Sequence, residues 1–441
     1  MTRQPLLITI AVICCTIVLI ILYAFFRRYS RKKRFMRLDR SRDRFNPIVS
    51  SMVQCPGEIP TKSLVSRPGS VDWLAIEEAL LHYIAHADAE LYPRLYKLFE
   101  SLGYVDHYLS KLGSSRMWER AEAAEHLGTI RCQRAVHALI TALEDKTRDV
   151  RNMAVYSLGV IGDIRALPAI MDSLKTGIAS LEDVSLRIVK SSIISFGADA
   201  VTHLRSGLKN DNWRVRCVVV DILGDLEGVD VGEDLSLALL DSEPDVRAKA
   251  AKGLGKKKVS AAVNDLMRLT EDPSWVVRLH STRALGLIGV VNSVDKLKQR
   301  LFDENWQVRR AAAEALGLMK DHSLEALRDI LLNHEDAYAK EMVVEEMQRT
   351  GLVWHVVGGL GDEREDVRKR AEETLYAIGL NGAFSPLINA LERGTPEIRS
   401  SLIGILGRFK APRAVDAIKA AAHSDIDIGV RKAARAVLGL H

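Results

Sequence analysis

The chain has 441 residues and a formal net charge of +5, and residues 27–44 contain ten basic and two acidic side chains. Without this segment and Arg3, residues 45–441 carry a net charge of −4. A nucleic-acid-binding protein concentrates Lys and Arg on its binding surface, so this balance argues against nucleic acid as a partner. The five cysteines form no Cys-x-x-Cys pair, which fits the reduced or buried thiols of a cytoplasmic protein.

The first residues predict a membrane-spanning helix. Residues 6–26 contain no charged side chain, and a helix of this length, at about 1.5 Å per residue, would cross the roughly 30 Å hydrocarbon layer. Because the basic segment 27–44 follows and only Arg3 precedes, the positive-inside rule places the rest of the chain in the cytoplasm. Residues 27–44 are also expected to lie against anionic headgroups. We therefore predict a single-pass protein of the cell membrane; an RNA-binding arm is the alternative for residues 27–44.

Two segments precede the main part of the chain. Residues 45–70 hold four of the twelve prolines and predict an extended tether. Helical periodicity begins at Val71, and residues 71–103 predict atypical capping helices, which stacked repeats need at their ends.

Four residues in this capping segment recur at intervals of four: Glu78, His82, His86 and Glu90. On one continuous helix, this spacing would align two imidazoles and two carboxylates that could hold a metal ion. The competing interpretation is the solvated face of an amphipathic helix, and we favour it because no further ligand is identifiable. We therefore predict no cofactor.

Residues 104–441 contain a motif that returns about every 31 residues: Val-Arg, small apolar residues, then Leu-Gly. Arg216, Arg247, Arg278 and Arg309 mark four consecutive copies. A fixed period of this size predicts stacked units rather than one globular core. Each copy has two apolar patterns of helical period, with the Leu-Gly expected near a helix end, and no alternation of period two. The predicted fold class is all-α, a solenoid of antiparallel helix pairs.

The repeated units resemble HEAT repeats of the bacterial subtype related to the phycobilisome lyases. In that family, an Asp that closes the first helix is paired with an Arg six residues later in the second helix. The resemblance implies an Asp–Arg ladder that joins the turns of neighbouring repeats by charge-assisted hydrogen bonds, so these residues are expected to be structural. The chain has six such pairs: Asp145/Arg151, Asp241/Arg247, Asp272/Arg278, Asp303/Arg309, Asp362/Arg368 and Asp425/Arg431.

Aromatic residues give the best indication of a binding surface. Trp213, Trp275 and Trp306 each lie three residues before the Arg of their repeat, and helical phase places them opposite the apolar stripe. The second helices of HEAT-like proteins line a concave face that commonly binds partners. A mixed apolar and charged surface there suits a protein partner. The alternative, that each Trp packs over its own turn, stays open. Helical phase also predicts exposed positions at Tyr156, Leu279 and Arg310, and at Val155, Val220 and Ile403.

Together these observations predict a membrane-anchored, cytoplasm-facing scaffold or adaptor that binds another protein, at the same membrane, without catalysis. An accessory subunit of a membrane complex for polysaccharide synthesis or transport is one version. The alternative is an enzyme, either a HEAT-like lyase or a metal-dependent enzyme using His82 and His86. HEAT-like deoxyhypusine hydroxylases bind iron through several His-Glu pairs, whereas this chain has one, His334-Glu335, and it contains no Gly-rich phosphate loop.

Overall fold

The computed structural model describes residues 3–54, 64–179 and 184–440, without the side chains of residues 3–15, 54, 176, 177 and 179. Within these ranges the regular structure consists of 25 α-helices and several short 3-10 helices, and no strand occurs. The prediction of an all-α fold is confirmed for this part of the chain. The chain divides into two compact units, Met1–His203 and Leu204–His441.

The first unit begins with one continuous helix, α1 (Arg3–Gln54). No helix in the described part of the chain is both long enough and apolar enough to span a membrane. The predicted transmembrane helix at residues 6–26 and the single-pass membrane localisation are therefore contradicted. The predicted contact of residues 27–44 with anionic headgroups loses its support with them.

The predicted tether at residues 45–70 is wrong in its first part. α1 continues through Pro47 to Gln54, and both Phe45 and Val49 are buried. The helix packs here against α2 (Val71–Ala85), so burial of apolar side chains offsets the backbone donor that proline lacks. Residues 55–63 lie outside the described part of the chain.

The rest of the first unit consists of short helices that pack in pairs. α4 packs against α5, α6 against α7, and α8 against α9; α5 also packs against α7, and α7 against α9. Each second helix therefore buries side chains against its own partner and against the neighbouring pairs, which is how stacked repeats share one core. The helices are α3 (Leu91–Ser101), α4 (Tyr104–Lys111), α5 (Met117–Thr129), α6 (Val136–Ala142), α7 (Arg148–Ile161), α8 (Leu167–Ala179) and α9 (Leu186–Ile194).

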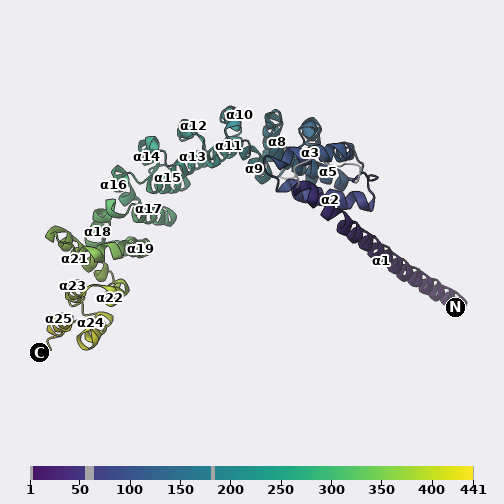
Figure 1. Cartoon of the computed structure of the whole chain (residues 1–441). Coiled ribbons are helices and arrows are strands. Elements are labelled where there is room, and N and C mark those ends of the chain that lie inside the picture. Colours follow the sequence, from purple (N-terminus) through teal and green to yellow (C-terminus); the bar gives the residue numbers. More distant parts are fainter. Residues whose placement is uncertain (1–2, 55–63, 180–183, 441) are drawn as a thin grey trace. The chain divides into compact units, whose positions relative to one another are not determined.

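The second unit repeats this arrangement (Figure 1). The second helices α11, α13, α15, α17 and α19 pack side by side in chain order, and the first helices α12, α14, α16 and α18 each pack against the second helix that follows. The predicted solenoid of helix pairs is thereby confirmed. The helices are α10 (Val201–Gly207), α11 (Trp213–Asp225), α12 (Gly232–Ala238), α13 (Pro244–Lys257), α14 (Val263–Leu269), α15 (Trp275–Ile288), α16 (Val294–Arg300), α17 (Trp306–Leu318), α18 (Leu324–Asn333), α19 (Ala337–Arg349), α20 (Leu352–Gly359), α21 (Glu365–Leu380), α22 (Phe384–Arg393), α23 (Pro396–Leu406), α24 (Pro412–Ser424) and α25 (Ile428–Leu438).

Short polar side chains start several of the second helices. Asn212 precedes α11 and Asn305 precedes α17, and the side chain of each accepts a hydrogen bond from a backbone N–H in the first turn. Asp336 does the same for α19. These caps set the first helical residue, and in α11 and α17 that residue is a tryptophan.

The glycine of the Leu-Gly motif lies near the helix end, as predicted, but its role is packing. Gly286 is within α15, and a Cβ atom there would lie 2.5 Å from the Cβ of Ala315 on α17. Gly255 on α13 faces Ala284 on α15 in the same way, at 2.6 Å from its Cα. Glycine therefore recurs because consecutive second helices approach too closely for a side chain.

Candidate functional site

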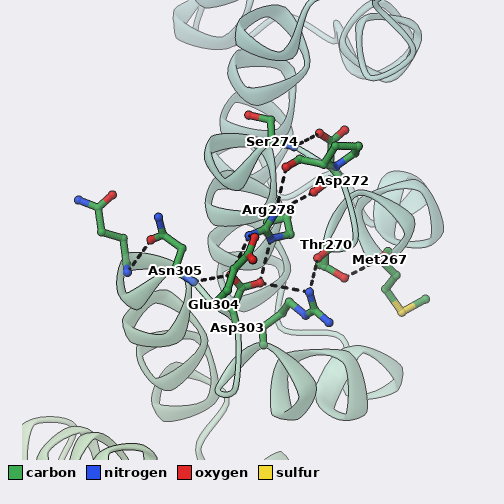
Figure 2. Close-up of polar contacts among 11 residues, drawn as sticks. Met267, Thr270, Asp272, Ser274, Arg278, Asp303, Glu304 and Asn305 are labelled. Atoms are coloured by element: carbon green, nitrogen blue, oxygen red, sulfur yellow. Dashed lines mark hydrogen bonds and ion pairs between the residues drawn. The ribbon is translucent and has the colours of Figure 1, made fainter.

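The Asp–Arg ladder can be followed at Arg278, a buried residue of α15 (Figure 2). Its Nε donates to Oδ2 of Asp303 at 2.8 Å and its Nη2 to Oδ1 at 2.9 Å. Its Nη1 donates to the backbone carbonyl of Asp272 at 3.0 Å. One guanidinium thus joins the turn of its own repeat to the turn of the next repeat by charge-assisted hydrogen bonds.

The bidentate contact recurs along the chain. Arg247 donates to the carboxylate of Asp272 at 2.9 and 3.0 Å, and Arg309 contacts Asp336. In each case the carboxylate belongs to the repeat after that of the arginine. The other bidentate pairs are Arg216–Asp241 and Arg399–Asp425 in the second unit and Arg120–Asp145 in the first.

The structure brings the predicted pairs together through the backbone rather than through the carboxylate. In five of them the arginine donates to the main-chain carbonyl of the aspartate six residues earlier: Asp145/Arg151, Asp241/Arg247, Asp272/Arg278, Asp362/Arg368 and Asp425/Arg431. In the sixth pair, Asp303 binds Arg278 and Arg309 binds Asp336.

Arg368 departs from the predicted ladder. It is exposed, and its Nη1 donates to the backbone carbonyls of Asp362 and Glu363 at 2.8 and 2.7 Å. Within the described ranges no hydrogen bond or ion pair joins its guanidinium to a carboxylate, and the carboxylate of Asp362 is held by Arg364 at 3.2 Å. Residues 393–395, where the aspartate of the next repeat would be expected, are Arg, Gly and Thr. The prediction that Arg368 joins neighbouring repeats is therefore wrong, because the next repeat supplies no carboxylate.

Three arginines of the ladder were missed by the sequence reasoning: Arg120, Arg216 and Arg399. Each lies one repeat before a predicted member, namely Arg151, Arg247 and Arg431. Arg216 already marks a copy of the repeat motif, and Arg120 lies 31 residues before Arg151. Pairing each aspartate with the arginine of the preceding repeat would have identified all three. Each aspartate was expected to bind the arginine of its own repeat, whereas its carboxylate binds the arginine of the preceding repeat.

The ladder keeps its carboxylates ionised. Burial alone would raise the pKa of Asp303, but hydrogen bonds from Arg278 and from the backbone N–H of Asn305 outweigh burial and lower the pKa. At Asp241 the hydrogen bond from Arg216 is the main reason that the pKa is lowered. The pKa values of three further ladder carboxyls are lowered as well: Asp145, Asp336 and Asp425.

The predicted tryptophans occupy the first residues of α11, α15 and α17. Trp275 is 41% exposed and Trp306 is 56% exposed. Trp213 is half-buried, and the Cζ atom of Arg214 lies over its ring, 5.2 Å from the centroid. Since about half of Trp275 and Trp306 faces solvent, these two side chains do not pack fully over their own turns.

The other predicted surface positions divide into two groups. Tyr156 in the first unit and Arg310 in the second are exposed, and Arg310 Nε donates to Glu314 at 3.2 Å. Leu279 is buried in a core cluster with Val308 and Ala311, so its predicted exposure is wrong. The predicted exposure of three further residues is also wrong, since all are fully buried: Val155, Val220 and Ile403.

The physical reason for these errors is the number of neighbours that each second helix has. It packs against its own first helix and against the second helices before and after it, as α15 does against α13, α14 and α17. Its buried stripe is therefore wider than that of a surface helix with one apolar face. Helical phase alone therefore predicts that residues at the edges of this stripe are exposed, although they are buried.

The charged residues around His280 were not predicted as a group. The imidazole of His280 on α15 is affected by Arg283 on the same helix and by Lys249 and Lys252 on α13. Burial first, and then these positive charges, lower the pKa of His280 to about 4, so the imidazole is neutral at pH 7. Three cations of α13 and α15 therefore lie near a neutral imidazole.

Tyr338 was also missed. It is exposed at the start of α19, and the Cζ atom of Arg309 lies 5.0 Å from its ring centroid. The residue lies one position beyond the 31-residue register of Trp275 and Trp306. Allowing the register a tolerance of one residue would have included it.

The predicted metal ligands Glu78, His82, His86 and Glu90 do not form one line. α2 ends at Ala85, so His86 caps the helix and Glu90 precedes α3. Glu78 is held by Arg42 of α1, with Nη2 2.7 Å from Oε2. Among the residues that the structure describes, no group of three or more His, Cys, Asp or Glu side chains could hold a metal ion. The alignment of these four candidate residues on one helix is therefore wrong, because α2 ends before His86 and Glu90.

The family described as HEAT repeats matches residues 105–183, 232–302, 271–348 and 355–439. No curated protein matches the chain.

Solved structures with similarity to this chain include three at low identity. Human deoxyhypusine hydroxylase in complex with glycerol is 18% identical over 55% of this chain and 95% of that chain, with a TM-score of 0.25. The CpcE–CpcF complex of phycocyanin lyase from Nostoc is 20% identical over 62% and 93%, with a TM-score of 0.23. Importin beta is 13% identical over 90% and 70%, with a TM-score of 0.43. At these values the likenesses carry no functional argument.

Proposed function

Because this chain belongs to the HEAT-repeat family, we propose that it is a scaffold or adaptor that binds another protein and does not itself catalyse a reaction. Stacked helix pairs present a long series of equivalent helix ends to a partner. The observation that carries the proposal is the exposure of Trp275 and Trp306 at the same position of two adjacent second helices.

The chemistry of this surface supports a protein partner. Arg283 and Arg310 follow the two tryptophans on α15 and α17, and both lie within ion-pair distance of Glu314, at 3.7 and 3.2 Å. Tryptophan and arginine are the residue types that dominate the binding energy of protein interfaces. We refer to Trp213, Trp275 and Trp306 as the Trp row.

The ladder supports the proposal by holding the turns before Trp275 and Trp306. Asp272 lies three residues before Trp275, and Asp303 lies three residues before Trp306. Asp272 accepts a hydrogen bond from the backbone N–H of Ser274 at 2.8 Å in addition to its contacts with Arg247. A turn fixed in this way presents its indole without an additional ordering cost on binding.

The proposal predicts that replacing the Trp row by Ala weakens partner binding by at least about tenfold, because exposed tryptophans are frequent interface anchors. The partner would first be identified with a photoreactive residue at position 306 in cells. Its affinity for the full chain and for the triple variant would then be measured with purified proteins.

Trp354 provides the matched control. It is an exposed tryptophan on α20, a first helix, and Trp354→Ala should leave the affinity unchanged. Cross-linking that is equally strong from positions 306 and 354 would count against the Trp row. A triple variant that loses its cooperative thermal unfolding would show that these residues serve packing instead.

A further inference from the structure

A cavity of about 390 Å³ lies in the first unit, whereas the Trp row belongs to the second. It is lined by residues of α1, α2, α4 and α5, with Trp73, Tyr108 and Trp118 among its walls. Cavities of this size hold small molecules or single side chains, and aromatic walls with a few polar groups are typical of binding sites. We call it the Glu77 pocket, after the carboxylate in its lining.

Glu77 is largely buried, and its Oε1 accepts a hydrogen bond from the hydroxyl of Tyr108 at 2.6 Å. The Nδ1 atom of His126 lies 3.6 Å from the same oxygen. This nitrogen is buried and has no hydrogen-bond partner among the described residues. Burial raises the pKa of Glu77 and lowers the pKa of His126, which favours a neutral imidazole beside the carboxylate. The pocket therefore contains polar groups whose bonding capacity is only partly used.

The charges in the lining do not balance. Three carboxylates line the pocket, those of Glu77, Glu119 and Glu122, against the two cations Arg34 and Lys111. Lys111 Nζ lies 3.1 Å from Glu119 Oε1, so these two charges compensate each other. No hydrogen bond or ion pair to Glu122 occurs in the described part of the chain, and its charge adds to the effects that raise the pKa of Glu77. Within the lining, negative charges therefore exceed positive ones by one, and Arg116, outside the lining, contacts Glu119 at 3.4 Å.

The walls indicate what kind of cation would fit. Trp118 is 55% exposed, and the Cζ atom of Arg116 lies 5.9 Å from its ring centroid. An indole face attracts ammonium and guanidinium groups, whereas a metal ion needs several oxygen or nitrogen ligands. The absence of a metal-binding group among the described residues agrees with an organic ligand.

We propose that the Glu77 pocket binds a monovalent organic cation, an ammonium or a guanidinium group. The carboxylates of Glu77 and Glu122 would accept its hydrogen bonds, and Trp118 would cover its apolar part. The group could be a free amine or the side chain of a lysine or arginine in a peptide, since both offer the same chemistry. This site is independent of the Trp row and of the partner bound there.

The test is calorimetric titration of the full chain with n-butylamine, n-butylguanidine and n-butanol, the last as a neutral molecule of the same length. A blocked peptide with a single lysine among glycines tests the peptide source. We expect saturable binding of the cations below about 10 mM and none of the alcohol. Tighter binding of the peptide than of n-butylamine would assign the site to a protein side chain, and the reverse would assign it to a free amine.

Variants locate the binding. Glu77→Gln and Glu122→Gln should each weaken binding by about tenfold, because each removes one charge-assisted contact. Glu144→Gln, at an exposed acidic residue of the same unit outside the lining, should change it less than twofold. If Glu77→Gln disturbs folding, Trp118→Leu at the exposed wall replaces it and should also weaken binding. Equal binding by the wild type and the Glu77→Gln/Glu122→Gln double variant, or no saturable binding by the wild type, would overturn the proposal.

Discussion

At the scale of single residues, Arg278 shows how a buried charge is accommodated. Its side chain is 7% exposed and that of its partner Asp303 is 2% exposed. All five guanidinium N–H groups have an acceptor: Asp303 through Nε and Nη2, the carbonyls of Asp272 and Pro273 through Nη1, and Glu304 through Nη2. Because no donor is left without a partner, the cost of removing the guanidinium from water is offset locally.

We therefore expect Arg278→Met to destabilise the helices around it by about 3–5 kcal/mol, since it leaves the carboxylate of Asp303 buried without its main partner. The local free energy of opening would be measured by hydrogen exchange of the amides in α15 and α17. Adding Asp303→Asn should restore part of the loss, because no unpaired charge then remains.

Arg268 offers a control for this experiment. It is an exposed arginine on α14 that contacts Asp265 of the same helix. Arg268→Met should change stability by less than about 0.5 kcal/mol, as is usual for surface ion pairs. Equal losses from the two substitutions would contradict a special role for the ladder.

At the scale of helices, the recurring glycine sets the distance between consecutive second helices. Gly286 on α15 lies against Ala315 on α17, and Gly255 on α13 lies against Ala284 on α15. The backbone contact allows the alanines of one helix to fill the space beside the next, as close packing requires. In these two copies the glycine therefore marks a contact between repeats, whereas Gly439 of the last copy caps α25 with a φ of +68°.

A substitution pair tests this contact. Gly286→Ala should destabilise the second unit by about 1–3 kcal/mol, because the new methyl group overlaps Ala315. Gly404, inside α23, has no atom within 4 Å of the position of an added Cβ. Gly404→Ala should therefore stabilise by about 0.5–1 kcal/mol through helix propensity. Urea midpoints of the two variants should shift in opposite directions, and shifts of the same sign would contradict the packing explanation.

At the scale of the whole molecule, the ladder links stability to pH in both units. The pKa values of Asp145, Asp241, Asp303, Asp336 and Asp425 are all lowered in the folded chain. An aspartate whose folded pKa lies below its unfolded pKa contributes stability above the unfolded value, near about 3.9, and loses it as the pH falls through the folded value.

The contribution of these aspartates to the urea midpoint should therefore change little from pH 7 down to about pH 4. Below about pH 4 the midpoint should fall steeply. Circular dichroism at a series of pH values would measure it. Because the ladder is partly buried, added salt should change this acid-dependent loss much less than it changes the contribution of exposed ion pairs. A midpoint that is unchanged at pH 3 would contradict the role assigned to these carboxylates.

The repeat period, the all-α class and the pairing of helices were predictable from the sequence, because each depends on residues within one repeat or in equivalent positions of the next. Most residues of the ladder could be identified in the same way, and so could the position of Trp275 and Trp306 at a helix start. Contacts that cross from one repeat to another were harder to predict from the sequence. Which arginine binds the carboxylate of Asp303 depends on how adjacent helix pairs stack. Arg368 matches the motif of its own repeat, yet it lacks a carboxylate partner because the next repeat does not supply one.

Tertiary structure alone decided the exposure of individual side chains. Leu279 is buried because α15 has neighbours on several sides, a fact that the phase of one helix does not contain. The helical state of residues 45–54 depends on packing between α1 and α2, although Pro47 and its surroundings predict an extended chain. The Glu77 pocket likewise exists only because three helices bring its aromatic and acidic residues together. A local pattern records the period of a repeat, whereas burial and charge balance depend on what lies beside each residue in space.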